Sequence, residues 1–548
     1  MKNILQAKIL LFLFTLVGII SCETTNLDLR TNPNALSADK GNPDFLLSNI
    51  QLEFKDVVES FGRTGAELTR IDYMFGRSYI NVYTPSNFDT RWTKSYTEIM
   101  SDINALVPLA EESGLEFHLG MAQFIEAYTM VTLVDYFGDV PYLDANLGAD
   151  NFNPGLDSGQ SVYEASYALI DQAIENFTSA QVKPTTDFFY NGDADSWIAA
   201  ANTLKIKMLM TTRLVDATAT SKINSIISSG DYIQSYTEDL QFNYGSNEVQ
   251  PDTRHPRYSL NYTVSGSDDY MSNHLMFYML ENQDPRMRYY FYRQNELTPG
   301  TDTDPNLETL QCSLQTAPDH LAGYPFCNLS NGYWGRDHGN NEGIPPDGFL
   351  KTIVGVYPAG GSFDDDTFIG KKNGAGGKGA GVTPMLLASS VKFWQAELAM
   401  ENGDNSSAKD LMAAGIKISI DKAMSFGTLD SEADLESFAP TSEDISNFTT
   451  ASKVRFDSDD ENGWNVLGQE FFTSLYGNGS DAYNFYRRTG YPKNLQPSTE
   501  PTPGPFIRSL FYPSNFVNNN SNVSQKDDVT NQVFWDTNPA SPGFPSSN

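Results

Sequence analysis

Apolar side chains recur at helical spacing along much of this chain, most clearly between residues 119 and 134. Glu126 is the only charged residue in that run. Large apolar residues at three- and four-residue steps fall on one helix face: Met121, Phe124, Ile125, Tyr128, Val131 and Val134. Gly138 then favours a helix end, and Pro141 prevents the helix from resuming. The pattern predicts a buried helix that runs into a tight turn, residues 135–142, rich in carboxylates and aromatic rings.

Most of the other helical patterns come in pairs. They are predicted at residues 43–59, 92–112, 161–177, 195–214, 383–400, 406–424, 468–476 and 481–489. Pairs of this length bury each other's apolar faces when they stack, as tetratricopeptide repeats do, although the consensus of that repeat is not met. The expected fold class is therefore mainly α, with a tetratricopeptide-like helical-hairpin scaffold.

Between residues 232 and 382 the helical period fades, and Gly, Pro, Asn and Asp become frequent. A structureless segment of that length is unusual in a compact domain, so we expect a folded, loop-rich ligand-binding subdomain rather than surface loops. Residues 493–548 are rich in Pro, Asn and Ser, and should wrap the surface. The expected organisation is one domain, residues 43–548, with helical units at about 43–231 and 383–492.

The N-terminus has the pattern of an export signal. Residues 9–20 are apolar and follow Lys2 and Lys8. That run is shorter than the roughly 20 residues that span a bilayer, but suits a signal-peptide core. It leads into Ile-Ile-Ser-Cys22, which matches the bacterial lipobox. We expect residues 1–21 to be a lipoprotein signal peptide, Cys22 to carry the lipid anchor and residues 22–42 to be a tether. The alternative is an ordinary secretory signal with a chance cysteine.

Charge narrows the classes of partner. The formal net charge is −33 at pH 7. Nucleic-acid binding depends on Lys and Arg contacts with phosphate, and anionic lipid surfaces attract basic patches, so both are disfavoured. Aromatic residues make up 12% of the chain. An acidic, aromatic-rich surface is compatible with a neutral ligand such as a glycan.

Two cysteines remain besides Cys22. Cys312 and Cys327 lie in a chain that is expected to be exported, so a disulfide between them is predicted. A loop of that size would contribute about 3 kcal/mol to stability. The alternative is two buried free thiols.

The sequence singles out no catalytic or metal site. It contains no HExxH or GxSxG motif and no Cys/His cluster with zinc-ligand spacing. The acidic stretch at residues 457–462 lacks the glycine and distal Glu of a calcium loop, which favours a solvated loop. We therefore expect no metal, no cofactor and no enzymatic activity, although a glycosidase carboxylate pair would leave no signature in the sequence.

Three motifs together resemble one family. They are the turn Asp-Tyr-Phe-Gly-Asp-Val-Pro-Tyr at residues 135–142, Gly-Tyr-Trp-Gly-Arg-Asp-His-Gly at 332–339, and Tyr-Arg-Arg-Thr-Gly-Tyr-Pro at 486–492. They resemble motifs of the SusD-like (SusD/RagB) outer-membrane nutrient-binding lipoproteins of Bacteroidetes. The resemblance implies a lipid-anchored cell-surface protein that captures an oligosaccharide or polysaccharide and delivers it to a SusC-like TonB-dependent transporter. Some members of this family capture peptides, so a peptide ligand is the alternative; a surface glycosidase is a more distant one.

Glycans are held by ring stacking and by polar side chains, which directs attention to aromatic residues on loops. The residues that we expect to bind glycan share that setting: Trp334, Arg336, Asp337, Asn340, Tyr79 and Tyr83. The alternative is structural. In that case Arg336 and Asp337 pair with each other, His338 is a buried hydrogen-bonding residue, and the two tyrosines pack the core.

Overall fold

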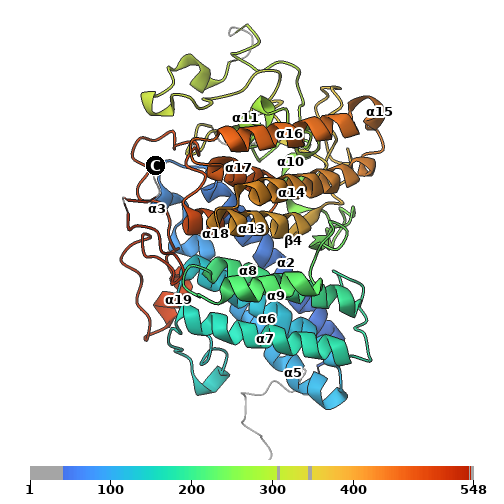
Figure 1. The fold of residues 1–548 in the computed structure, drawn as a ribbon, viewed down its shortest axis with the longest axis vertical. Coiled ribbons are helices and arrows are strands. Elements are labelled where there is room, and N and C mark those ends of the chain that lie inside the picture. The colour runs from blue at the N-terminus through green and yellow to red at the C-terminus, as the bar shows by residue number, and fades with distance from the viewer. Residues whose placement is uncertain (1–40, 305–308, 344–347, 542, 545–548) are drawn as a thin grey trace, which may run out of the picture. The chain divides into compact units, whose positions relative to one another are not determined.

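Helices that follow one another along the chain pack together as hairpins. The computed structural model describes residues 41–304, 309–343, 348–541 and 543–544. Its first part contains six long helices: α2 (Pro43–Leu68), α5 (Ser101–Ser113), α6 (Glu116–Phe137), α7 (Gly159–Ser179), α8 (Ala194–Thr212) and α9 (Ala219–Ser229). Shorter helices lie between them: α3 (Tyr79–Val82), η2 (Pro85–Phe88), α4 (Asp89–Thr93), η3 (Lys94–Met100) and η4 (Gly148–Asp150). Helix α7 packs between α6 and α8, and α9 packs on α8 (Figure 1).

A second group of helices follows the loop-rich insert. It comprises α13 (Ala388–Glu401), α14 (Asn405–Ser425), η7 (Gly427–Leu429), α15 (Leu435–Phe438), α16 (Ser442–Ser458), α17 (Trp464–Ser474), α18 (Ser480–Thr489) and α19 (Ser514–Asn519). Helix α14 packs along α13 and also contacts α16 and α17. Figure 1 shows both groups as layers of neighbouring helices, from α5 to α16. The predicted mainly α, tetratricopeptide-like helical-hairpin scaffold is confirmed.

The insert has only short elements. They are β1 (Leu240–Asn243), α10 (Pro256–Asn261), α11 (Asn273–Glu281), α12 (Met287–Tyr290), β2 (Phe291–Tyr292), η5 (Gln311–Leu314), η6 (Asp319–Leu321), β3 (Ile353–Val354) and β4 (Val382–Leu386). Strand β1 pairs antiparallel with β4, and β2 pairs antiparallel with β3. The yellow-green segment after about residue 300 extends beyond α11 and α16 (Figure 1).

The first helix is longer than the sequence pattern predicts. It continues from residue 59 to Leu68, through Gly62 and Gly65. A Cβ on Gly62 would lie 2.6 Å from the Asn478 side chain, and one on Gly65 would lie 2.5 Å from the Gly479 carbonyl oxygen. These glycines allow a close approach to the turn between α17 and α18, so they mark a packing contact rather than a helix end.

Further elements differ from the prediction, among them α9, which the sequence pattern did not indicate. The start of the helix predicted at 383–400 is strand β4, whose residues are all buried, and the helix itself begins at Ala388. Helix α16 was not predicted, because few of its residues are apolar. Its sequence does carry a helix-start signal, since Thr441 and Asp444 form a capping box.

The C-terminal end of α6 joins distant parts of the chain. The Asp135 carboxylate accepts hydrogen bonds from the Tyr163 hydroxyl (2.5 Å), the Asn484 amide (2.6 Å) and the Trp535 indole (3.0 Å). Burial raises the pKa of Asp135. The Tyr136 hydroxyl donates to the Phe61 carbonyl oxygen at 2.7 Å. This motif is therefore a structural junction between helices and the C-terminal segment.

The C-terminal segment does more than wrap the surface. Trp535, Ile507 and Leu510 are fully buried. The Leu510 amide donates to the Tyr136 carbonyl oxygen at 2.7 Å, so the segment is joined to the C-terminal end of α6. These residues complete the core of the helical scaffold.

Residues 43–548 form one compact unit. The predicted signal peptide and Cys22 lie outside the described residues. No helix in the part of the chain that the structure describes has the length and apolar character needed to cross a membrane.

Candidate functional site

The segment 332–343 is held by close backbone contacts. The Arg336 amide donates to the Met271 carbonyl oxygen at 2.8 Å, and the Asn273 amide donates back to the Arg336 carbonyl oxygen at 2.9 Å. A Cβ on Gly335 would lie 1.9 Å from the Met271 oxygen, so only glycine fits between the two segments. This contact fixes the positions of Trp334 and Arg336 on either side of Gly335.

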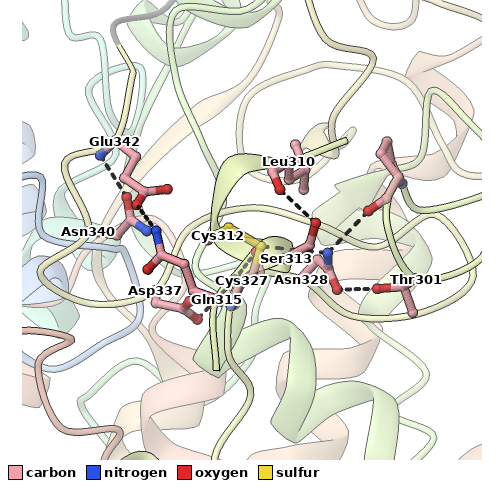
Figure 2. The surroundings of a disulfide bond; sticks show 12 residues. Thr301, Leu310, Cys312, Ser313, Gln315, Cys327, Asn328, Asp337, Asn340 and Glu342 are labelled. Carbon is pink, nitrogen blue, oxygen red and sulfur yellow. Dashed lines mark hydrogen bonds between the residues drawn. A yellow bond between two sulfur atoms is a disulfide. The ribbon is translucent and has the colours of Figure 1, made fainter. Parts of the chain in front are cut away.

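A disulfide closes the loop above this segment. Cys312 and Cys327 are bonded to each other, as Figure 2 shows. Beneath the bridge lies a cavity of about 220 Å³, here called the disulfide-loop cavity, lined by Tyr270, Thr309, Leu310, Gln311, Cys312, Cys327, Trp334, Gly335, Arg336, Asn340, Glu342, Gly343 and Phe349. Three of the predicted glycan-binding residues, Trp334, Arg336 and Asn340, therefore share one cavity.

A smaller cavity of about 130 Å³ adjoins it and shares Cys312, Asn340 and Glu342 with it. Its polar edge is braced by two hydrogen bonds, visible in Figure 2: Gln315 Nε2 donates to Glu342 Oε1 at 3.2 Å, and the Glu342 amide donates to Asn340 Oδ1 at 2.8 Å. Glu500 also lines this cavity. The two cavities together offer neighbouring apolar and polar walls.

Arg336 has unusual surroundings. Its guanidinium lies 4.1 Å from the Tyr270 ring centroid and 5.0 Å from that of Phe75. Its one hydrogen bond among the described residues is long, at 3.5 Å to the Gly343 carbonyl oxygen, and its Nη1 has none. It forms no ion pair with a described carboxylate, although it is 95% buried, with 5% of its surface exposed. Cation–π contacts replace the usual carboxylate, and the cation retains donor capacity.

Trp334 forms part of the cavity wall rather than an exposed platform. Only 1% of its surface is exposed, and its ring meets Phe349 edge-on, with centroids 5.7 Å apart. The indole Nε1 has no hydrogen-bond partner among the described residues. A buried donor without a partner costs free energy, so a ligand that offers an acceptor to this indole N–H would be favoured.

The Asp337 carboxylate accepts hydrogen bonds from three separate segments of the chain. Its Oδ1 accepts from Asn273 Nδ2 at 3.0 Å and from Gln496 Nε2 at 3.1 Å, and its Oδ2 accepts from the Cys327 amide at 2.5 Å. Burial raises the pKa of Asp337. This carboxylate is fully buried and does not pair with Arg336. We therefore assign it to positioning the disulfide rather than to ligand contact.

The two tyrosines of the early aromatic loop lie in the core. Tyr79 is fully buried, and its hydroxyl lies 3.0 Å from His338 Nε2. Tyr83 is 3% exposed and donates to Glu67 at 3.1 Å. Neither ring has a face open to a ligand, so the expectation that they stack on glycan is replaced by a packing role. Apolar neighbours from distant segments covered them, which local sequence could not indicate.

Sequence reasoning missed Tyr270 and Glu342. Tyr270 provides the ring on which Arg336 lies, and its other close cation is Lys351 Nζ, at 3.7 Å from the ring centroid. Nothing local to Tyr270 indicates this contact, because its partners come from later segments. Glu342 follows the motif at 332–339 closely in sequence, so its position two residues after Asn340 could have indicated that it lines the same cavity.

The acidic stretch near residue 459 has a local role. Asp459 accepts hydrogen bonds from the Glu461 and Asn465 amides and stabilises the start of α17. Within the described ranges, no group of three or more His, Cys, Asp or Glu side chains is arranged to hold a metal ion.

The fold and the cavity define a helical-repeat protein with a ligand-sized opening in an inserted loop region. A family model described as "Starch-binding associating with outer membrane" matches residues 33–307 and 356–513. The chain therefore belongs to this SusD-like family. The stretch between the matched parts contains the disulfide, Trp334 and Arg336. A search of curated proteins found no match.

Solved structures show the same fold at low sequence identity. A SusD/RagB family protein from Bacteroides thetaiotaomicron has a TM-score of 0.63 at 18% identity, over 91% of this chain and 99% of its own. A SusD homolog from Bacteroides fragilis has a TM-score of 0.65 at 19% identity, over 90% and 99%. A chitin-binding SusD homolog from Flavobacterium johnsoniae has a TM-score of 0.61 at 17% identity, over 90% and 99%.

Proposed function

We propose that this protein is a cell-surface glycan-binding lipoprotein that captures an oligosaccharide or polysaccharide without cleaving it. The observation that carries the proposal is the shared cavity of Trp334, Arg336 and Asn340 beneath the disulfide. Aromatic walls provide apolar contact with sugar C–H groups, and the unpartnered Arg336 and Trp334 nitrogens are donors for sugar oxygens. Membership of a family described as starch-binding supports the same ligand class.

The proposal extends to location and partner. The lipobox at Cys22 supports attachment to the outer membrane by lipid, and the family description names that membrane. Several buried acyl methylenes contribute about 0.8 kcal/mol each, so an anchor with more than one chain holds stably. We propose that the bound glycan passes to a SusC-like TonB-dependent transporter, as the family resemblance implies.

A surface glycosidase is the second candidate, because Glu342 and Glu500 line the same small cavity. Glycosidases work with two carboxylates on either side of the scissile bond. The family assignment favours capture over cleavage. A test of binding must therefore also measure bond cleavage, and must include a peptide ligand.

The test is affinity electrophoresis of the soluble form that begins after Cys22, which keeps the compact unit 43–548 intact. Native gels contain starch, glycol chitin, galactomannan, polygalacturonate or gelatin, and reducing ends are assayed in the same samples. Arg336→Gln is compared with Arg254→Gln. Arg254 is a matched control because it also lies over a tyrosine ring, that of Tyr258 at 5.9 Å, but is paired with Asp252.

We expect one of the polysaccharides to retard the protein without releasing reducing ends. Arg336→Gln should weaken retention about tenfold, the effect of losing one charge-assisted hydrogen bond, while Arg254→Gln should not. Retention in gelatin alone would make the protein a peptide binder. Release of reducing ends that is lost in Glu342→Gln would make it a glycosidase.

A further inference from the structure

A larger opening lies on the other side of the Trp334 segment. It is a groove of about 490 Å³ between the turn that joins α11 to α12 and the helices α15 and α16, here called the Tyr333 groove. Its lining is Met279, Leu280, Asn282, Gln283, Asp284, Pro285, Met287, Arg288, Tyr333, Phe438, Pro440, Asp444, Asn447, Phe448 and Ala451. Tyr333 lines this groove, whereas the next residue, Trp334, lines the disulfide-loop cavity. Consecutive side chains thus serve two different openings.

The charged groups that line the groove are already satisfied within the protein. Asp284 accepts from the Arg286 guanidinium at 2.8 Å and 2.5 Å. Arg288 donates to Asp366 at 2.8 Å. Asp444 accepts from the amide and hydroxyl of the residue that caps its own helix. A charged ligand would therefore have to compete with these internal contacts.

The groups that remain available are neutral. Tyr333 is 95% buried, with 5% of its surface exposed, yet its hydroxyl makes no hydrogen bond to any described residue. Burial raises the pKa of Tyr333, so the hydroxyl stays protonated and can donate. The exposed amide side chains of Gln283 and Asn447 also make no hydrogen bonds within the described part of the chain. Each of these amides can both donate and accept.

The floor of the groove is apolar. Met279, Met287 and Phe448 are buried there, and the half-buried Phe438 ring lies at one side, with the Arg288 guanidinium 4.9 Å from its centroid. An apolar floor beneath neutral donors and acceptors suits a ligand that has C–H faces and hydroxyl groups but no charge. A pyranose ring has both features.

We propose that the Tyr333 groove is a second subsite that binds a neutral pyranose unit of the captured glycan. This inference rests on the proposed function, which it extends from one sugar-binding position to two. Two subsites on one chain favour a polymer over a short oligosaccharide, because binding at one raises the effective concentration at the other. Tyr333, Gln283 and Asn447 are the residues that would contact the second sugar.

The test uses the same gels with starch, glycol chitin and galactomannan. Tyr333→Phe removes only the hydroxyl, and Asn447→Ala changes an exposed side chain that folding does not need. Tyr167→Phe is the matched control, since Tyr167 lines a cavity of about 460 Å³ on the helical scaffold, between α7, α8 and α9. Melting temperatures are measured for all variants.

We expect Tyr333→Phe and Asn447→Ala each to weaken retention by the retarding polysaccharide about three- to tenfold, as the loss of one or two hydrogen bonds implies. Tyr167→Phe should migrate as the parent protein does. If Arg336→Gln abolishes retention while both groove variants keep it, the second subsite is refuted and the proposed function stands. If only the anionic polygalacturonate retards the parent protein, the neutral second subsite is refuted and the proposed function stands; if none of the polysaccharides does, both proposals fail.

Discussion

Trp535 and Trp334 are both almost fully buried, but their indole N–H groups meet different surroundings. Trp535 donates to Asp135 at 3.0 Å, at the C-terminal end of α6, where the C-terminal segment packs on the helices. The Trp334 indole has no acceptor among the described residues and lines a cavity. The indole N–H of Trp535 thus completes a hydrogen-bond network, whereas that of Trp334 has no acceptor among the described residues.

Two arginines repeat the contrast. Arg488 makes a two-pronged contact with the buried Glu397, at 2.7 Å on each side. Arg336 lies on the Tyr270 ring and pairs with no described carboxylate. In this molecule a recognisable motif does not distinguish structure from binding, because most residues of all three motifs are buried. The distinction lies in whether the polar atoms are satisfied, since an unsatisfied buried donor gains most from a ligand acceptor.

The largest expected effect comes from breaking the satisfied network at Asp135. Asp135→Ala leaves the donors of Tyr163, Asn484 and Trp535 buried without an acceptor. We expect the free energy of unfolding to fall by about 3 to 5 kcal/mol, measured by urea denaturation. Asp144→Ala, at an exposed position in the following loop, should change it by less than about 0.5 kcal/mol. A loss below about 1 kcal/mol for Asp135→Ala would show that the Asp135 hydrogen bonds contribute little to stability.

The arginine pair sharpens the contrast directly. Arg488→Gln leaves Glu397 with less compensation in the interior, and should lower the free energy of unfolding by about 3 kcal/mol or more. Arg336→Gln strands no described carboxylate, so it should lower stability by about 1 kcal/mol or less while weakening glycan retention. Urea denaturation and affinity electrophoresis on both variants separate the two outcomes. Equal losses of stability would show that Arg336 is also a structural residue.

The disulfide tests whether the binding region depends on a covalent restraint. Cys312→Ser combined with Cys327→Ser opens a loop closed across a sequence separation of 15 residues. A loop of that size predicts a loss of about 3 kcal/mol by chain entropy. Because Cys312 and Cys327 line the disulfide-loop cavity, glycan retention should also weaken. Unchanged retention in the double variant would mean that the hydrogen bonds of Asp337 suffice to hold the loop.

The last expected effect is a pH dependence of stability. Burial, with smaller contributions from Arg257 and Arg70, lowers the pKa of His255 and of His274 to about 3. In the unfolded chain these imidazoles take up a proton near pH 6.5. The unfolded state therefore binds more protons between about pH 3 and 6.5, so the free energy of unfolding falls as pH drops through that window.

Each such histidine contributes a slope of up to about 1.4 kcal/mol per pH unit. His274→Leu should remove the contribution of His274 to the pH dependence of the free energy of unfolding. Both ring nitrogens of His274 lack hydrogen-bond partners among the described residues, so the substitution breaks no hydrogen bond there. Urea denaturation of the parent and the variant between pH 4.5 and 7.5 measures the difference. The same slope in both proteins would contradict the assignment.

Local pattern was sufficient for most of the scaffold. The periodic run before Asp135 predicted α6, and Gly138 lies at its end with φ +81°. Pattern failed where a residue served a distant contact. The first helix was predicted to end at residue 59, but Gly62 and Gly65 allow α2 to continue and touch the α17–α18 turn. The polar surface of α16 hid a helix whose capping box was readable.

For the candidate site, the sequence pointed to one segment but not to the surroundings of each residue. It placed Trp334, Arg336 and Asn340 together because they share one motif, and it paired the two cysteines that the structure joins. It could not show that Tyr79 and Tyr83 are covered, or that Tyr333 lines a separate groove.

The sequence alone therefore determined the helical scaffold and the family resemblance, because these follow from short-range periodicity and contiguous motifs; the export signal stays a prediction. Only the tertiary structure decided which aromatic and charged side chains are satisfied. That property depends on partners brought together from distant segments, such as Tyr270 beside Arg336 or Asp135 beside Trp535. Burial and hydrogen bonding are set by those long-range contacts, so packing and not composition decided which side chains line the proposed binding cavity.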